Sequence, residues 1–253
     1  RQFREQGFCV LEQCVPAQHL AVLRGACEDA MAATDRRMDA EGTDVSGINH
    51  RGKRYFSTNT SLQHPELFDF IHSELMADSC RKLIGPDAWV FHEQYVVKCP
   101  GADSSFSWHQ DSGYVPDDTP HKPYLTCWVA LDDITADNGT VFMLPSDRAG
   151  VNERIAHART EGSNDLVGYT GDDPGEPVTC PAGSIAFFSS VTFHRSGANT
   201  TDRLRRVYLI QYSPELIRRP DGSNWSRGER FLVDGQVVAE RPDAAAIAQL
   251  PVY

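Results

Sequence analysis

A histidine and an aspartate lie two residues apart in the segment WHQDSGY, residues 108–114. In a β-strand, side chains at positions i and i+2 point to the same face, so His109 and Asp111 would project together while Gln110 points away. A neutral imidazole and a carboxylate on one face are two ligands for a divalent metal ion. A second histidine, His194, follows an apolar strand-like run further along the chain. We therefore predict a catalytic metal centre held by His109, Asp111 and His194.

Two histidines and one carboxylate form a facial set of ligands that leaves the other coordination positions open. This arrangement suits the oxygen chemistry of non-haem Fe(II), because the open positions can accept a chelating cosubstrate and then O2. A closed structural zinc site would instead use four protein ligands, usually including thiolates. The ligand types therefore favour an iron centre.

Three segments in order carry a resemblance to a known family. They are WHQDSGY, then YLTCWVALDDITADNGTVFMLPSDRAG at 124–150, then HRSGAN from His194 with an arginine after it. Their combination resembles the phytanoyl-CoA dioxygenase family of Fe(II)/2-oxoglutarate-dependent oxygenases, over about residues 3–215. One departure is Pro-Ser-Asp-Arg at 145–148, where the family usually has Pro-Gly-Ser-His. That departure bears on the substrate side of the site and not on the metal.

The resemblance implies a double-stranded β-helix (a cupin-like jelly roll) with the metal inside the barrel mouth. It also implies that an arginine eleven residues after the distal histidine binds the far carboxylate of 2-oxoglutarate, and Arg205 stands at that position. A guanidinium group suits this role because it binds a carboxylate through two parallel hydrogen bonds. Arg203 and Arg206 are alternatives: Arg203 shares the face of Arg205 if the strand extends that far, whereas Arg206 points away. Ser196 can donate to the same carboxylate.

Further pocket residues are predicted on two strands. Thr126 and Trp128 share one strand face, which by resemblance lines the cosubstrate pocket, although core packing explains Trp128 equally well. Gln94 and Lys98 share a face of the strand that precedes the His-x-Asp motif. They are candidates for contact with the cosubstrate or the substrate.

A basic cluster comprises His50, Arg51, Lys53 and Arg54. It is interpreted either as a contact for an anionic substrate or as a solvated loop, and the sequence leaves both open. Among the other histidines, His92 is a candidate pocket residue. The remainder are expected at the surface: His19, His64, His72, His121 and His157.

The composition limits the kinds of partner that this protein is expected to bind. The chain has 253 residues, is 40% hydrophobic and carries a formal net charge of −11, which argues against general nucleic-acid binding. No signal peptide or membrane-length apolar segment is found, and the seven cysteines form no Cys-x-x-Cys pair. Free thiols in a reducing compartment are expected, and hence a cytoplasmic protein without membrane contact. The expected partner is a small-molecule substrate, and the sequence carries no signal for an oligomeric state.

The elements that must position these residues show two kinds of sequence pattern. Helical periodicity is seen at 16–37 and again at 64–85, whereas 38–60 is polar and is predicted as a loop. From residue 88 onward, short runs rich in β-branched and aromatic residues alternate with Gly, Pro, Asn and Asp. The predicted strands lie at 88–99, 124–133, 139–145, 183–190 and 204–213.

These patterns predict a mainly β protein with N-terminal helices packed on a β-barrel or β-sandwich. The family resemblance implies that this is a jelly roll and that the chain is organised as a single Fe(II)/2-oxoglutarate dioxygenase domain over 1–253. Within it we expect a helical N-terminal support at 1–87 and a jelly-roll core at 88–215. The stretch 146–177 is too long and polar for a hairpin turn and is predicted as a functional insertion. Residues 216–253 form a C-terminal extension.

The predicted activity is hydroxylation of a small molecule, with Fe(II), 2-oxoglutarate and O2 as cofactor and cosubstrates and with release of succinate and CO2. Desaturation, epoxidation or cyclisation on the same iron is the alternative outcome. Halogenation is disfavoured because Asp111 occupies the position that a halide would need. A non-catalytic, cupin-like metal-binding protein is the remaining alternative. The family resemblance spans many substrates and does not identify one here.

Overall fold

The computed structural model describes residues 1–101, 104–159 and 165–241. Two antiparallel sheets dominate it. The order of strands in the larger sheet is β1 (Phe8–Leu11), β12 (Ile185–Ser189), β7 (Leu125–Ala130), β14 (Arg205–Ser213), β5 (Ala88–Lys98), β4 (Arg54–Thr58), β3 (Asn49–His50) and β2 (Val45–Ser46). The order in the smaller sheet is β11 (Glu176–Pro177), β8 (Val141–Leu144), β13 (Phe193–Ser196) and β6 (Phe106–His109).

The remaining elements are short apart from one helix. The helices are α1 (Gln2–Gln6), α2 (Ala17–Glu41), α3 (Phe68–Ile71), α4 (Glu74–Leu83) and α5 (Ser146–Ala149), with 3-10 turns η1 (Thr60–Leu62), η2 (Pro65–Leu67) and η3 (Asp111–Tyr114). A two-stranded sheet joins β9 (Ala158–Arg159) to β10 (Leu166–Val167), and β15 (Glu229–Val233) pairs with β16 (Gln236–Val237) and with β5. None of the helices described is long and apolar enough to cross a membrane.

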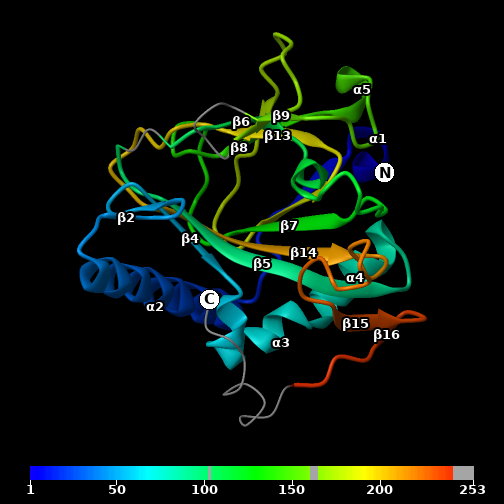
Figure 1. Ribbon diagram of the computed structural model, residues 1–253, viewed down its shortest axis with the longest axis horizontal. Helices are drawn as coiled ribbons and strands as arrows, with labels where there is room; N and C mark the ends of the chain where they lie inside the picture. The colour runs from blue at the N-terminus through cyan, green and yellow to red at the C-terminus, as the bar shows by residue number, and fades with distance from the viewer. Residues whose placement is uncertain (102–103, 160–164, 242–253) are drawn as a thin grey trace.

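The molecule has three layers (Figure 1): α2, α3 and α4 cover one side of the larger sheet, and the smaller sheet lies across its other side. α2 buries Leu23, Cys27, Ala30 and Met38 among others, at intervals of three and four residues, so one face of the helix packs on the sheet. The facing sheets form the predicted jelly roll, with helices in the N-terminal part of the chain.

Alternation along the larger sheet separates the helix side from the inner side. In β5, Tyr95 and Val97 are buried in the core beneath the helices, whereas Gln94 and Val96 line a cavity between the two sheets. The same period of two places Arg205 and its neighbours at i+2 on the inner face of β14. The strand pattern therefore aims a fixed set of side chains at the space between the sheets.

The prediction of a loop over 38–60 is wrong. α2 continues to Glu41 and ends at Gly42, which has a φ of 65°. The three strands β2, β3 and β4 follow, and β4 pairs with β5 over five residues. β2 and β3 are only two residues long, too short to show the alternation by which a strand is recognised in a sequence.

We propose that residues 1–253 form one domain. β1, near the start of the chain, and β15, near the end of its described part, both join the larger sheet. The segment at 146–177 contributes α5, the β9–β10 pair and β11, the last of which extends the smaller sheet. The described parts of this segment are thus tied to the core.

Candidate metal centre and substrate cavity

The structure brings the three predicted metal ligands together. His109 ends β6, and His194 lies opposite it on β13 as its antiparallel partner. Asp111 is the first residue of η3, and its Oδ1 lies 3.5 Å from His194 Nε2. One ligand atom from each of the three residues lies within 4.8 Å of the other two. The expectation that His109 and Asp111 share one strand is wrong, because the chain leaves the strand at Gln110, yet both side chains reach the same point.

Both histidines present the nitrogen that a metal needs. His109 Nδ1 lies 2.7 Å from the carbonyl oxygen of Ser107, and His194 Nδ1 lies 3.2 Å from that of Thr192. A carbonyl can only accept, so Nδ1 carries the hydrogen and Nε2 keeps its lone pair for a metal. Burial, together with the nearby His194, lowers the pKa of His109 to about 3, which keeps this imidazole neutral.

The carboxylate of Asp111 is held by two donors on the larger sheet. Its Oδ2 accepts a hydrogen bond of 2.6 Å from the hydroxyl of Thr126 and one of 3.0 Å from the amide nitrogen of Gln211. Thr126 is fully buried and does not line the cavity, so the structure places it behind Asp111 and not in the predicted cosubstrate wall. Gln211 was not predicted, although a lone polar residue at an even spacing from Arg205 in an apolar strand is a signal for it.

A cavity of about 430 Å³ lies between the sheets, and the three ligands, Arg205, Ser196, Trp128 and Gln94 all contribute to its wall. Arg205 is 1% exposed. Its guanidinium donates to the carbonyls of Val96 and Gly139, lies 5.7 Å from the ring centroid of Trp128, and leaves its buried Nε without a partner. Burial lowers the pKa of Arg205 to about 9, so the group remains cationic at neutral pH.

This arrangement fits the implied iron and 2-oxoglutarate. The donor set is two imidazole nitrogens and one carboxylate oxygen, with no thiolate among the three, as Fe(II) prefers. A buried guanidinium with an unsatisfied Nε in the same cavity is a fixed cation for a diacid.

The two alternative arginines, Arg203 and Arg206, lie outside the cavity. Arg203 lies before β14, is exposed and is 3.9 Å from the carboxylate of its neighbour Asp202. Arg206 lies on the opposite face of β14 from Arg205, where it pairs with Asp132 and, on α2, with Glu28. Arg205 is therefore the one of the three that reaches the cavity.

Lys98 does not line the cavity, although Ser196 does. The lysine is 1% exposed, and its ammonium donates to the Ser196 hydroxyl at 2.8 Å and to the carbonyl of Gly197. With its oxygen accepting from Lys98, Ser196 keeps its own hydrogen for donation into the cavity.

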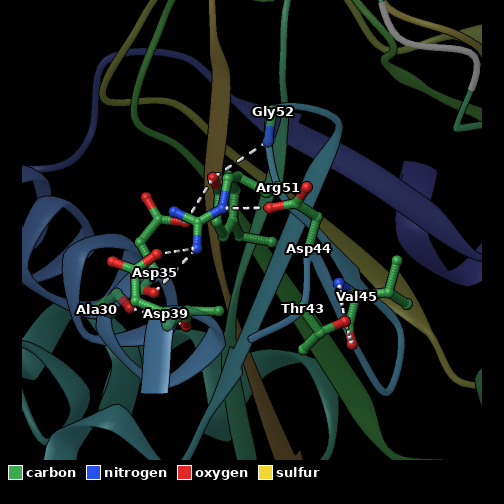
Figure 2. Close-up of polar contacts among 10 residues, drawn as sticks. Ala30, Asp35, Asp39, Thr43, Asp44, Val45, Arg51 and Gly52 are labelled. Carbon is green, nitrogen blue, oxygen red and sulfur yellow. Dashed lines mark hydrogen bonds and ion pairs between the residues drawn. The ribbon is translucent and has the colours of Figure 1, made fainter. Parts of the chain in front are cut away.

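Arg51 of the basic cluster serves the fold. Figure 2 shows its guanidinium surrounded by acidic residues at the end of α2 and in the following loop. It donates to Asp44 at 2.8 Å and to Asp39 at 2.6 Å, and it lies 3.4 Å from a carboxylate oxygen of Asp35. Arg51 does not line the cavity.

Lys53 and Arg54 of the cluster differ from Arg51. Lys53 is exposed, and Arg54 donates from Nε to the carbonyl of Ile48. The guanidinium of Arg54 also lies 5.5 Å from the ring centroid of Phe106, which lines the cavity, but Arg54 itself does not. The solvated-loop interpretation thus describes Lys53, while Arg51 and Arg54 bind to the surrounding chain.

Two histidines expected at the surface are instead structural, whereas His92 lines the cavity. His72 is buried, with Nε2 at 3.1 Å from Glu229. His157 accepts a hydrogen bond from the backbone N–H of Gln110 at 2.9 Å. The Gln110 side chain in turn donates to the carbonyls of residues 153 and 191. Gln110 thus points away from the metal ligands, as predicted, and links their turn to the 146–177 segment.

The unusual Pro-Ser-Asp-Arg segment lies outside the cavity. Ser146 to Ala149 form α5, and Arg148 pairs with Asp173 and Glu176 in the 146–177 segment. All seven cysteines are free, and five of them are buried.

Comparisons with known proteins place this geometry in context. A probable phytanoyl-CoA dioxygenase from Caenorhabditis elegans is 25% identical over 241 residues, covering 87% of this chain and 75% of that protein. A phytanoyl-CoA dioxygenase domain-containing protein 1 from Danio rerio is 28% identical, covering 64% of this chain but only 57% of its own length. A probable alpha-ketoglutarate-dependent hypophosphite dioxygenase from Stutzerimonas stutzeri is 24% identical, covering 84% and 77%.

Solved structures share the fold at low sequence identity. The non-haem monooxygenase ThoJ superposes with a TM-score of 0.72 at 21% identity, covering 98% of this chain and 91% of the other. EvdO2 from Micromonospora carbonacea, complexed with 2-oxoglutarate, has a TM-score of 0.66 at 22% identity, covering 85% and 89%. The model of the family described as phytanoyl-CoA dioxygenase matches residues 3–207. The chain therefore belongs to the phytanoyl-CoA dioxygenase family.

Proposed function

We propose that this protein is a non-haem Fe(II)- and 2-oxoglutarate-dependent oxygenase of small molecules. The observation that carries the proposal is one cavity that holds a two-histidine, one-carboxylate cluster together with a buried arginine whose Nε has no partner. Membership of the phytanoyl-CoA dioxygenase family supports the same chemistry. A closed structural site would not need the cavity or the buried cation.

Each residue has a defined task in this proposal. His109, Asp111 and His194 hold the iron, and the hydrogen bonds to their outer atoms fix the direction of each ligand. Arg205 binds the far carboxylate of 2-oxoglutarate, and Ser196 donates a second hydrogen bond to it. When bound, iron and 2-oxoglutarate supply the activation of O2, with succinate and CO2 as co-products. The side chains around the metal exclude water from the reacting position.

Hydroxylation is the proposed outcome on the substrate. A cavity wall that keeps substrate carbon near the iron is enough for hydroxylation, whereas ring formation or desaturation requires further control over the substrate. Among proteins of this fold are a carbocyclase and an epimerase from nogalamycin biosynthesis, so desaturation, epoxidation and cyclisation form the second candidate class. Product mass separates these outcomes.

The test of the function uses metal and cosubstrate directly. Purified protein is supplied with Fe(II), 2-oxoglutarate and air, and succinate release is measured with and without a substrate library. We expect succinate release that depends on both iron and 2-oxoglutarate. His194→Ala should abolish iron binding and turnover, because two ligands rarely hold Fe(II) against water, whereas His64→Ala, a variant of a histidine outside the cavity, should keep both.

Full iron occupancy and normal turnover in His194→Ala would overturn the ligand assignment. Binding of a metal without any consumption of 2-oxoglutarate would instead favour the cupin-like binding protein.

A further inference from the structure

Resting on the proposed function, we propose that the substrate is an uncharged, ring-bearing small molecule. It would be bound by an aromatic cluster at the end of the cavity away from Arg205. This aromatic cluster consists of Phe91, Val115, Tyr124 and Trp225. The same walls disfavour a substrate that places a phosphate or phosphonate group inside the cavity.

The aromatic cluster is a preformed apolar wall. Phe91 and Tyr124 pack edge to face, with ring centroids 4.6 Å apart and planes at 77°. Both rings and Val115 are buried, and Trp225 packs against them from the C-terminal part of the chain. All four residues line the cavity. Such a wall offers ring faces and edges to a flat or cyclic ligand and offers a charged group no partner.

The position of the aromatic cluster separates substrate from cosubstrate. Arg205 lies opposite Lys98 at one end of β5, whereas Phe91 lies seven residues back, roughly 20 Å along the strand. Asp111 lies near the Phe91 end, because its partner Gln211 is opposite residue 92 of β5. A ring at the aromatic cluster would therefore lie beside the metal ligand Asp111, whereas a diacid at Arg205 would lie toward the other end of the strand.

The cavity wall has little positive charge to offer. Among the described lining residues, Arg205 and Arg195 are the arginines, and no lysine is present. The guanidinium of Arg195 packs on the ring of Phe142 at 4.0 Å and donates to the carbonyl of Pro174. Alternation along β13 places this side chain on the opposite face of the sheet from His194. Once Arg205 has bound 2-oxoglutarate, no arginine or lysine of the described wall is left for an anionic substrate.

Other parts of the chain add no positive charge to the cavity wall. Residues 102–103, 160–164 and 242–253 contain no lysine, arginine or histidine. Arg219 lies 5.1 Å from the ring centroid of Trp225, but it donates to the carbonyls of Asn224 and Trp225 and does not line the cavity. Asp111 adds a carboxylate to the wall. A buried anion without a cation is strongly disfavoured.

Neutral polar groups remain available beside the aromatic cluster. His92 and Ser226 both line the cavity, and either can exchange a hydrogen bond with a hydroxyl or carbonyl group. Trp225 and Ser226 also lie beyond residue 207, where the match to the family ends. This part of the wall is thus supplied by the chain's own C-terminal segment.

The test compares a neutral ring compound with its phosphate ester. Calorimetric titrations of 2-naphthol and of 2-naphthyl phosphate are made without oxygen into protein loaded with Fe(II) and 2-oxoglutarate. We expect 2-naphthol to bind at least about tenfold more tightly than its phosphate ester. Trp225→Ala should weaken naphthol binding about tenfold, because an aromatic contact and its buried area are lost. Trp225→Phe, which keeps a ring, should stay close to wild type.

Trp89→Ala is the matched control, since Trp89 also lies beside β15 but does not line the cavity, and it should bind naphthol normally. Equal or tighter binding of the phosphate ester, absent naphthol binding, or an unchanged affinity in Trp225→Ala would each overturn the proposal. The naphthol titration is repeated without iron and 2-oxoglutarate. If naphthol binds in a Trp225-dependent way without iron and 2-oxoglutarate, the aromatic cluster is a ligand site in its own right. That result would stand even if no succinate were released and the proposed oxygenase function were wrong.

Discussion

The hydroxyl of Thr126 donates a hydrogen bond of 2.6 Å to Asp111 Oδ2, the carboxylate oxygen that faces away from His194. Gln211 donates to the same oxygen, so the two donors leave Oδ1 directed toward the imidazoles. In a metal site, such partners of a ligand set its direction and its basicity. The inner face of the larger sheet thereby controls a ligand that belongs to a turn beside the smaller sheet.

Thr126→Val should weaken Fe(II) binding by about tenfold to a hundredfold while the protein stays folded. The substitution keeps the shape of the side chain but removes the donor to Asp111. The measurement is an anaerobic Fe(II) titration, with Thr126→Ser as the control that restores the hydroxyl. An Fe(II) affinity in Thr126→Val equal to wild type would show that this hydrogen bond does not position Asp111.

Arg205→Ala should raise the apparent requirement for 2-oxoglutarate by at least about a hundredfold and leave Fe(II) affinity near wild type. A lost buried charge pair costs on the order of 3–5 kcal/mol, which sets this size. Initial rates of succinate release against 2-oxoglutarate concentration provide the measurement. Arg203→Ala is the matched control, because Arg203 is exposed. If the control variant showed the loss and Arg205→Ala did not, the assignment of the cosubstrate arginine would be wrong.

The strand pattern predicted a β-barrel or β-sandwich because the long strands are apolar and clearly bounded, and the family resemblance implied the jelly roll. The predicted strand at 204–213 agrees with β14 to within one residue. The resemblance assigned Arg205 to the cosubstrate, and alternation along the strand placed Arg206 on the opposite face. The loop predicted over 38–60 missed β2 and β3, which are two residues long and show no alternation, and it also missed the five-residue β4. Local patterns thus predicted the residues on long strands and missed the short edge strands.

In the candidate site, too, local patterns identified residues but did not predict contacts between distant parts of the chain. The histidine and aspartate motif identified the residues, but not the turn at Gln110 that ends β6, because that turn depends on contacts with distant residues. The buried Gln110 side chain donates hydrogen bonds to the carbonyls of residues 153 and 191, and its backbone N–H donates to Nε2 of His157. Thr126 was placed on the correct strand face, but its contact with Asp111 spans 15 residues and arises only when the sheets face each other.

A buried ion cluster behind the cavity wall predicts a pH-dependent stability. Glu93 is fully buried and accepts hydrogen bonds from the backbone of Ser61 and from Arg227, which follows the cavity residues Trp225 and Ser226. Burial raises the pKa of Glu93 above its usual value of 4.5, although Arg227 opposes the shift. Arg227→Leu should destabilise the fold by about 3 kcal/mol near neutral pH, because a carboxylate is left buried without its cation.

The sign of the pH dependence follows from proton uptake. With its pKa raised in the folded state, Glu93 holds a proton at pH values where the unfolded chain has lost it, so stability falls as pH rises above about 4.5 toward the folded pKa. Urea unfolding of Arg227→Leu at pH 5 and pH 8 should show the larger loss at pH 8. The double variant Glu93→Gln with Arg227→Leu should reduce that difference to the part that belongs to Glu229, which also pairs with Arg227. A destabilisation of Arg227→Leu that is equal at both pH values would contradict this account.

The last prediction concerns the reaction type and depends on Asp111. As a ligand, its carboxylate fills the third protein position on the metal, so a halide finds no exchangeable position beside those of 2-oxoglutarate and O2. We expect oxygenated or desaturated product from the wild-type enzyme, and no halogenated product even in high chloride or bromide. Its partners Thr126 and Gln211 hold the carboxylate in place, which makes transient release in favour of a halide unfavourable.

The measurement is mass spectrometry of the product formed in bromide, whose isotope doublet reveals a brominated compound. Asp111→Gly is the informative comparison, because it removes the carboxylate and opens its coordination position; it should lose most oxygenation. Asp133→Gly is the control for removal of a carboxylate outside the cavity, and it should keep wild-type products. A brominated product from the wild-type enzyme would show that Asp111 does not bind the iron. In that case the converging geometry of His109, Asp111 and His194 would need another explanation, since their ligand atoms lie within 4.8 Å of one another.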